Sequence, residues 1–436
     1  MIEAAATPQP GRRAGLDRLT QFVPDAGARY ARYRSFDFGP DQRGNTSVLS
    51  PYIRHRLVLE IEVLGAILEQ HSRSDAAKFV DEVFWRTFFK GWLEQHPAAW
   101  KNYVRAVGDR FEELERDPSL LERYNSATAG NTGIDCFDAW AAELVATGYL
   151  HNHARMWFAS IWVFTLKLPW ELGADFFLRH LMDGDPASNT CGWRWVAGLQ
   201  TSGKTYLARV SNIVSCTGGR FNPRGKLATS APPLTESNPP EFTPLTPAVD
   251  SEPNGPFALL ITEEDCAAEI GLLDSRPETI LGLVTTRRRS LIPVGVPAYT
   301  FAMSAVTDAV QRASDAFDTE GAVIEADYDC DELIEWATNS GVSTIVTSYP
   351  PVGPVADFLD EAEPRLRHHG VELVRLRRRY DEVCWPHASR GFFRLKKALP
   401  RILRELGLEG AEDQPEVSMN RIEKQATAVA MKRMPR

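Results

Sequence analysis

The segment between Gly130 and Trp195 decides how this chain folds. It contains His151-Asn152-His153-Ala154-Arg155-Met156 and, further on, Asp183-Gly184-Asp185-Pro186-Ala187-Ser188-Asn189, followed by Gly192-Trp193-Arg194-Trp195. Residues 152–167 are apolar almost all round, as expected for a helix buried inside a large bundle. Apolar residues around this segment recur three and four positions apart, which predicts one all-helical domain over residues 15–221.

The second half of the chain has a different pattern. Residues 222–255 are rich in proline and poor in large apolar residues, a composition typical of a linker. Beyond them, short apolar runs alternate with helical stretches, which predicts a Rossmann-like parallel α/β domain over 256–410. The predicted strands are 257–262, 279–284, 322–325, 344–347 and 372–376, and the predicted helices are 264–273, 299–316, 330–339 and 353–369. Residues 411–436 are predicted to be a partly basic tail.

Length, charge and cysteine content limit the class of protein. A chain of 436 residues predicts two or three domains. The net charge of −9 means that any contact with nucleic acid needs a local basic patch. The six cysteines form no Cys-x-x-Cys pair, which argues against a zinc ribbon and favours a reducing, cytoplasmic location. The N-terminus has no apolar signal segment and residues 156–166 are too short to span a membrane, so no membrane partner is expected.

Common nucleotide-binding and metal-binding patterns do not occur. The chain has neither Gly-x-Gly-x-x-Gly after a strand nor Gly-x-x-x-x-Gly-Lys-Ser/Thr. His151 and His153 are two positions apart and would point in different directions on a helix, so no metal site is expected. A dinucleotide bound by this chain needs another kind of pocket.

The motifs of residues 15–225 together resemble those of the photolyase and cryptochrome family. The resemblance implies a helical domain that binds FAD non-covalently. Asp183 and Asp185 match the family's acidic pair, which faces the flavin ring and the ribose hydroxyls, and Asn189 matches the residue that faces flavin N5. Arg155 matches an arginine that pairs with the isoalloxazine region, and Arg86 matches one near the flavin.

A second cofactor motif precedes these residues. The run Thr46-Ser47-Val48-Leu49-Ser50 resembles the family's loop whose hydroxyls and helix N-terminal amides hold the FAD phosphates, and Tyr30 matches a phosphate-contacting tyrosine. Taken alone, the same run describes an ordinary helix start, with Ser50 as N-cap and Pro51 at the first position.

Further residues match the family's substrate pocket: Glu82, Trp85, Asn152, Met156 and Trp195. In that family the glutamate hydrogen-bonds the damaged pyrimidines, the two tryptophans stack on them, and the asparagine contacts both adenine and substrate. Methionine at this position is typical of pyrimidine-dimer photolyases. If the family resemblance is set aside, Glu82 and Arg86 are predicted to form an ordinary i,i+4 ion pair on an amphipathic helix. His153 departs from the family, because pyrimidine-dimer enzymes have an arginine there.

Tryptophans also indicate a path for electrons. Trp193 matches the family's tryptophan nearest the flavin in the photoreduction chain, and Trp170 matches the second. The third has no counterpart, because its aligned position is Asp117. Trp157 and Trp162 are alternative donors.

The resemblance implies a light-driven repair enzyme. Reduced FAD would split cyclobutane pyrimidine dimers in damaged DNA, with Glu82, Asn152 and Asn189 in the catalytic positions. One alternative is a cryptochrome-like blue-light receptor without repair activity, favoured by His153 and the acidic net charge; another is a flavoprotein with neither role. Family members place an α/β antenna domain before the FAD domain, so the α/β domain found here after it is predicted to be a permuted antenna domain. The antenna pigment and any signalling partner are not indicated.

Overall fold

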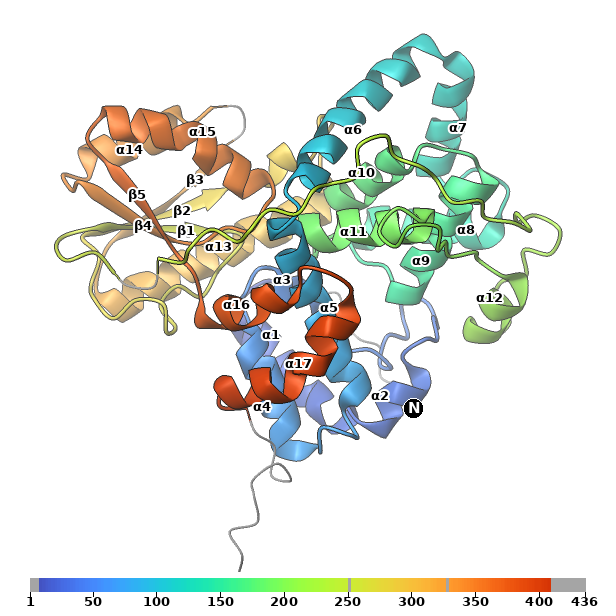
Figure 1. The fold of residues 1–436 in the computed structure, drawn as a ribbon, viewed down its shortest axis with the longest axis horizontal. Helices are drawn as coiled ribbons and strands as arrows, with labels where there is room; N and C mark the ends of the chain where they lie inside the picture. Colours follow the sequence, from blue (N-terminus) through green and yellow to red (C-terminus); the bar gives the residue numbers. More distant parts are fainter. Residues whose placement is uncertain (1–7, 250–251, 327–328, 409–436) are drawn as a thin grey trace, which may run out of the picture.

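The computed structural model describes residues 8–249, 252–326 and 329–408, and the predicted tail 411–436 lies outside these ranges. Figure 1 shows a helical part beside an α/β part, with the last helices of the chain lying against the helical part. The predicted fold class, a helical region followed by a parallel α/β domain, is confirmed. No helix in the described ranges is long and apolar enough to cross a membrane.

The helical part begins with α1 and ends with α12. Its helices are α1 (Arg12–Phe22), α2 (Ala28–Tyr33), α3 (Ser50–Arg54), α4 (Glu60–Gln70), α5 (Ala77–Glu94), α6 (Ala98–Arg116), α7 (Pro118–Thr128), α8 (Asp135–Thr147), α9 (Asn152–Ser160), α10 (Trp170–His180), α11 (Pro186–Ala197) and α12 (Val210–Cys216), with a 3₁₀ turn η1 (Val23–Asp25). The predicted apolar helix over 152–167 is α9 followed by a π-helical turn, η2 (Ile161–Thr165). Turns of this kind often mark functional sites.

The α/β part contains a five-stranded parallel sheet. Its strands are β1 (Ala258–Thr262), β2 (Thr279–Val284), β3 (Gly321–Glu325), β4 (Thr344–Ser348) and β5 (Glu372–Leu376). They lie in the order β3-β2-β1-β4-β5, and each matches its predicted strand to within one residue. Helix α13 (Val296–Phe317) covers one face, while α14 (Asp331–Asn339) and α15 (Pro354–His368) cover the other (Figure 1). A short 3₁₀ turn, η3 (Thr286–Arg289), follows β2.

The central strand β1 joins the two parts. Leu259 and Ile261 belong to the main hydrophobic core, which extends through the helical part, whereas Ala258 and Leu260 belong to a second core beneath α14 and α15. Burial on both faces explains why the strand is a continuous apolar run rather than an alternating one. The sheet therefore shares a packed interface with the helical part.

The predicted helix over 264–273 is wrong. The residues after β1 form a series of turns, because an arginine from elsewhere binds carbonyls that a helix would use internally. Arg378 donates to the carbonyl oxygens of Ala267 and Ile270 at 2.7 and 2.8 Å. The hydrogen bonds of Arg378, which is distant in the sequence, outweigh the local preference of residues 264–273 for a helix.

The predicted linker, 222–255, has no helix or strand among its described residues and runs along the surface of the molecule (Figure 1). It is nevertheless attached at several points. Both oxygens of Glu236 accept from Arg194 at 2.7 Å, and the amide of Thr243 donates to the carbonyl of Gln95 at 2.8 Å. The linker thus follows a defined course.

After β5 the chain returns to the helical part. The segment comprises α16 (Arg379–Cys384), a 3₁₀ turn η4 (Trp385–His387) and α17 (Phe392–Glu405), and it packs on α5. The carbonyl of Trp385 accepts from Gln95 at 2.8 Å. A Cβ atom on Gly91 would lie 2.9 Å from Ala388, so α5 needs glycine at this crossing. Within the predicted domain 256–410, the sheet ends at β5 and the last helices contact α5 instead.

Buried charges fill the boundary between the two parts. Arg54 and Arg56, at the end of α3, are each 1% exposed. Arg54 donates to Glu264 at 2.6 Å, and Arg56 donates to both oxygens of Asp381 at 2.7 Å. Asp265 lies 3.5 Å from Arg56. These carboxylates follow β1 and β5, so their pairing fixes how the sheet sits against α3.

Removal of one member of this set should be strongly destabilising. Arg56→Met removes the cation that Asp381 and Glu60 share, and breaking a buried pair in this way costs about 3–5 kcal/mol. Urea unfolding followed by circular dichroism should show that loss. The control is Arg13→Met, since Arg13 is a solvent-exposed partner of Asp17 on α1 and should change stability by about 0.5 kcal/mol or less. Equal stabilities of the two variants would contradict the role given to Arg56.

Candidate functional site

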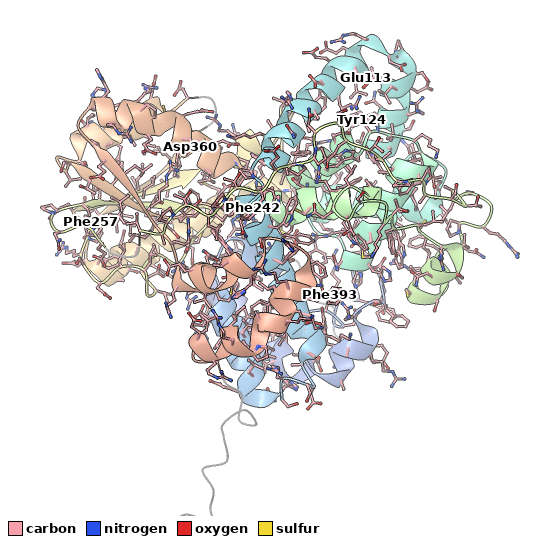
Figure 2. All side chains as sticks on the ribbon, viewed as in Figure 1. Glu113, Tyr124, Phe242, Phe257, Asp360 and Phe393 are labelled. Carbon is pink, nitrogen blue, oxygen red and sulfur yellow. The ribbon has the colours of Figure 1, made fainter. Side chains whose placement is uncertain are left out.

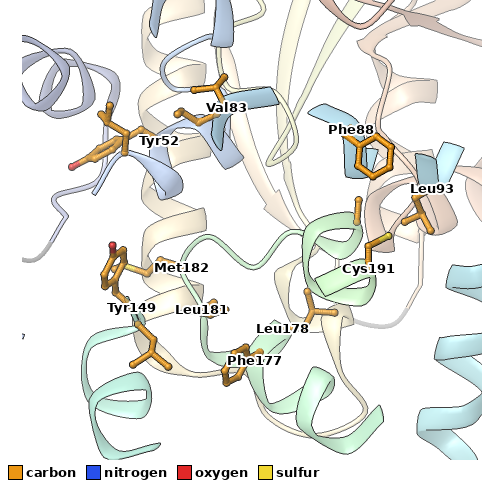
Figure 3. Packing of buried hydrophobic residues seen from close by; sticks show 14 of the residues in the cluster. Tyr52, Val83, Phe88, Leu93, Tyr149, Phe177, Leu178, Leu181, Met182 and Cys191 are labelled. Atoms are coloured by element: carbon orange, nitrogen blue, oxygen red, sulfur yellow. The ribbon is translucent and has the colours of Figure 1, made fainter. Parts of the chain in front are cut away.

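A cavity of about 640 Å³ opens in the helical part, lined by α5, α9, α11 and the loop before α3. Most of the residues predicted for the site line it: Tyr30, Thr46, Ser47, Val48, Ser50, Glu82, Trp85, Arg86, Asn152, Arg155, Met156, Asp183, Asp185, Asn189, Trp193 and Trp195. Leu49 is instead fully buried in the core, and Trp170 packs on Tyr103 with ring centres 5.8 Å apart. Figure 3 shows part of the hydrophobic packing around the cavity, including the lining residues Phe177, Leu181 and Tyr149.

Asp183 is an ionised carboxylate on the cavity wall. Both of its oxygens accept from Arg155 at 3.0 Å. Burial opposes its charge, but Arg155, Arg86 and the hydroxyl of Ser50 outweigh burial and lower its pKa. Gly184, which follows, has no room for a side chain, since a Cβ would lie 2.7 Å from the carbonyl oxygen of Leu178.

Asp185 is the N-cap of α11 and accepts from the amide of Ser188 at 2.7 Å. Burial opposes its ionisation, and the charges of Lys90, Arg86 and Arg54 reverse that effect, so its pKa is lowered. Lys90, which belongs to none of the sequence motifs, has its Nζ 3.7 Å from Asp185 and 3.8 Å from Glu264. A lysine among the apolar residues of α5, one turn after Arg86, was the available signal.

The loop Thr46-Ser47-Val48-Leu49-Ser50 has an unusual backbone. Val48 has a φ of 52°, a left-handed conformation that is strained for a β-branched residue and is typical of functional loops. Arg18 holds the loop by donating to the carbonyl oxygens of Ser47 and Thr46 at 2.6 and 2.9 Å. The ordinary-cap alternative is not observed, because α3 starts at Ser50 and no side chain caps it. The Ser50 hydroxyl instead helps to lower the pKa of Asp183.

Glu82 and Trp85 lie one turn apart on α5. Glu82 pairs with Arg34 rather than with Arg86, so the i,i+4 pair suggested by the sequence is not formed. Burial raises the pKa of Glu82 despite the neighbouring Arg34. Trp85 stacks on Phe392 of α17, with ring centres 3.8 Å apart and planes 10° apart. Phe392 is not among the lining residues, whereas Trp85 is.

Asn189 is oriented by the backbone of α10. Its side-chain nitrogen donates to the carbonyl of Ala174 at 2.8 Å, an orientation assigned from the hydrogen-bond network. The side-chain oxygen is therefore the atom available to a ligand as an acceptor. This geometry suits a hydrogen-bond donor in the cavity.

His153 is held by two protein groups. Nδ1 lies 2.9 Å from the carbonyl of Ser35, Nε2 lies 3.2 Å from the Tyr206 hydroxyl, and the ring stacks on Trp157 at 4.1 Å. Burial lowers its pKa, so it is neutral at pH 7. It does not supply the positive charge that the family's arginine has at this position.

Trp193 makes its aromatic contacts with Phe177 and with a second tryptophan. Its ring meets Phe177 at 5.1 Å and Trp162 at 6.2 Å, both edge-on. Trp162 in turn meets Tyr124 at 6.2 Å. Asp117, which the resemblance aligns with the family's third tryptophan, caps α7 by accepting from the amides of Ser119 and Leu120.

The cavity suits a large polar ligand. Ser188 Oγ and Trp193 Nε1 are buried polar atoms on lining residues, and neither finds a hydrogen-bond partner within the described part of the chain. Hydroxyls, three carboxyl groups and arginines surround an apolar interior, which is the donor and acceptor set that a flavin dinucleotide requires.

The comparisons agree with this geometry. Residues 79–236 match the family model described as the FAD binding domain of DNA photolyase. The helical part is thus a FAD-binding flavoprotein domain. The matched residues form a FAD-binding domain of the photolyase and cryptochrome family, and FAD is its cofactor.

Several curated relatives are named deoxyribodipyrimidine photo-lyase. One from Thermus thermophilus is 36% identical over 248 residues, covering 56% of this chain and 55% of the relative. One from Escherichia coli is 29% identical over 218 residues, covering 49% of this chain and 44% of the relative. The chain spans about half the length of the curated relatives it matches.

Two solved structures are also similar. One is a bacterial class III photolyase from Agrobacterium tumefaciens, 28% identical, with a TM-score of 0.39 and coverage of 48% of this chain and 43% of that one. The other is a cryptochrome of Synechocystis, 24% identical, with a TM-score of 0.39 and coverage of 51% and 45%.

Asp183 should be needed for FAD retention. Asp183→Asn removes the charge opposite Arg155, and hydrogen bonds to charged groups contribute about 1.5–3 kcal/mol, so FAD affinity should fall roughly tenfold or more. Flavin absorbance after gel filtration would measure the loss. Because the folded pKa of Asp183 lies below the unfolded value of about 3.9, its contribution is present above that pH and is lost only as pH falls through the folded pKa.

FAD retention by the unmodified protein should accordingly be constant from neutral pH down to about pH 5. Asp17→Asn, on the exposed face of α1, serves as the matched control and should keep FAD. Full flavin occupancy in Asp183→Asn would show that the cofactor is held elsewhere.

Proposed function

We propose that this protein repairs cyclobutane pyrimidine dimers in DNA with light. The main support for the proposal is that the predicted cofactor residues and the predicted substrate residues line the same cavity. The cofactor residues Asp183, Asp185 and Arg155 share it with Trp85 and Trp195, which belong to the substrate side. The names of the curated relatives support the same activity.

The substrate residues would bind a flipped-out dimer. Trp85 and Trp195 are both half-buried and so can offer ring surface to bases, and base–aromatic stacking contributes about 1–3 kcal/mol per base. Extrusion of a damaged base is easier than that of a paired one, which gives selectivity for the lesion. Bound FAD in its reduced form would supply light absorption and the electron that opens the cyclobutane ring and then returns to the flavin.

Glu82 and Asn152 would hold the polar edges of the dimer. The raised pKa of Glu82 favours a carboxyl group that donates a hydrogen bond to a pyrimidine carbonyl. Asn152 begins α9 and is exposed at the cavity, so its amide can reach both cofactor and substrate. Such preorganised donors stabilise negative charge that develops on the substrate.

A receptor without repair activity is the second candidate. The observation in its favour is His153, which is neutral and already bonded to Ser35 and Tyr206. A dimer bound here would lack the positive charge that the family's arginine provides.

We propose that the α/β domain is a permuted antenna domain that holds no pigment at the position where antenna domains usually bind one. Ligands of open parallel sheets bind at the carboxyl edge where strand order reverses, here between β1 and β4. At that edge, Asp265 pairs with Arg378 and Arg56 and also accepts a hydrogen bond from Ser348 at 2.7 Å. These side chains occupy the edge of the sheet. Support for the permutation is the parallel sheet and its packed interface with the helical part.

Repair should depend on the stacking tryptophans. Trp195→Ala should weaken binding of dimer-containing DNA about tenfold, since one base–aromatic stack is lost, and should reduce repair per photon. Repair would be measured by illuminating FAD-loaded protein with an oligonucleotide that carries one thymine dimer. Phe242→Ala, at an exposed aromatic residue of the linker, is the control. No light-dependent repair and no preference for damaged DNA in the unmodified protein would favour the receptor.

Photoreduction should use Trp193 and then Trp162. The ring contact between them motivates this order, and Trp170 is the family's alternative. Trp193→Phe and Trp162→Phe should both slow bleaching of the oxidised flavin under blue light with added thiol, whereas Trp170→Phe should not. If Trp170→Phe alone slowed bleaching of the flavin, the second electron donor would be Trp170, as in the family, and not Trp162.

A further inference from the structure

Helix α17 has two unlike faces. Phe392, Leu395, Leu399, Ile402 and Leu403 are buried against the protein. The other face carries Phe393, Lys397, Arg401 and Arg404, spaced four, four and three residues apart and all exposed. We call these four residues the α17 stripe. Residues with this spacing lie on one side of a helix.

The stripe begins beside the wall of the cavity. Phe392 stacks on Trp85, a lining residue, and the next residue, Phe393, is 75% exposed. Figure 2 labels Phe393 on α17, the helix that packs on α5. A large exposed aromatic side chain next to a cavity is a common feature of a binding surface.

The charge of α17 is opposite to that of the chain. The helix has five basic residues and one acidic residue, FFRLKKALPRILRE, in a protein of net charge −9. A local basic patch is what an acidic protein needs to bind nucleic acid. From Phe393 to Arg404 the helix advances roughly 16 Å, at 1.5 Å per residue. That length matches several nucleotides of a DNA strand.

We propose that the α17 stripe binds the DNA strand next to the flipped dimer. Lys397 and Arg401 contact backbone phosphates, and Phe393 enters the base stack where the dimer has left it. The proposal rests on the repair function proposed above and adds to it the surface that positions the duplex. Apolar wedges of this kind are used by proteins that distort DNA.

A membrane surface fits the same helix less well. Amphipathic helices bind lipid by burying their apolar face in the bilayer. The apolar face of α17 is already packed on α5 and α16, so only Phe393 would be left to insert. Phosphates of a nucleic acid need only the charged face.

The test uses the full chain loaded with FAD. Fluorescence anisotropy would give its affinity for a duplex with one central thymine dimer and for the undamaged duplex, over a range of salt. K397Q/R401Q should bind both duplexes about tenfold more weakly, with a salt slope shallower by about 2. F393A should lower affinity for the dimer-containing duplex about tenfold and leave the undamaged duplex nearly unchanged.

Matched controls are K101Q/R105Q on α6 and L291A, where Leu291 is 72% exposed on the α/β part. Both should behave as the unmodified protein, and flavin absorbance confirms folding of every variant. Unchanged affinities in K397Q/R401Q overturn the proposal, whether or not α17 binds another protein. The repair function is refuted if the unmodified protein shows no preference for the dimer-containing duplex and no repair. Even then, weaker binding of both duplexes by K397Q/R401Q supports DNA binding by the α17 stripe. Equal losses on both duplexes in F393A overturn the wedge role.

Discussion

The architecture depends on the pairing of three buried residues at the end of α3 with groups that follow strands β1 and β5. Arg54 pairs with Glu264, His55 Nδ1 lies 2.7 Å from the carbonyl of Glu263, and Arg56 pairs with Asp381. Unlike apolar packing, which tolerates small sliding, buried ions need their partners at hydrogen-bond distance. The set therefore fixes one orientation of the sheet relative to the helices.

The same charges extend to the cofactor site. Lys90 lies between Asp185, at the cavity, and Glu264, at the boundary, and is 3% exposed. Arg54 donates to the carbonyl of Gly184, between the two carboxylates of the motif. The electrostatics of the cofactor pocket are thus set partly by the α/β part, although the motif that identifies the pocket lies wholly in the helical part.

Much of the fold could be predicted because its signals are local. The strands are apolar runs between turn residues, and the motif around Asp183 and Asn189 identified the cavity wall through the family. The failures have a common cause. The run after β1 looks helical until Arg378 binds its carbonyls. The amphipathic pattern of α17 shows that one face is buried, but it does not say that α5 covers it. Lys90 has no motif of its own, and no motif signals the ring contact between Trp193 and Trp162.

Pairing between distant residues also affects how the protein is made. Arg56 and its partner Asp381 are 325 residues apart. At 5–20 residues per second, a ribosome takes about 16–65 s to add that length. During this time the helical part has its cofactor motifs, Arg56 has Glu60 but not Asp381 as a partner, and α5 lacks the cover of α16 and α17. Helix α5, which lines the pocket, is covered only later, by residues 379–405, although the sequence that defines the pocket is made first.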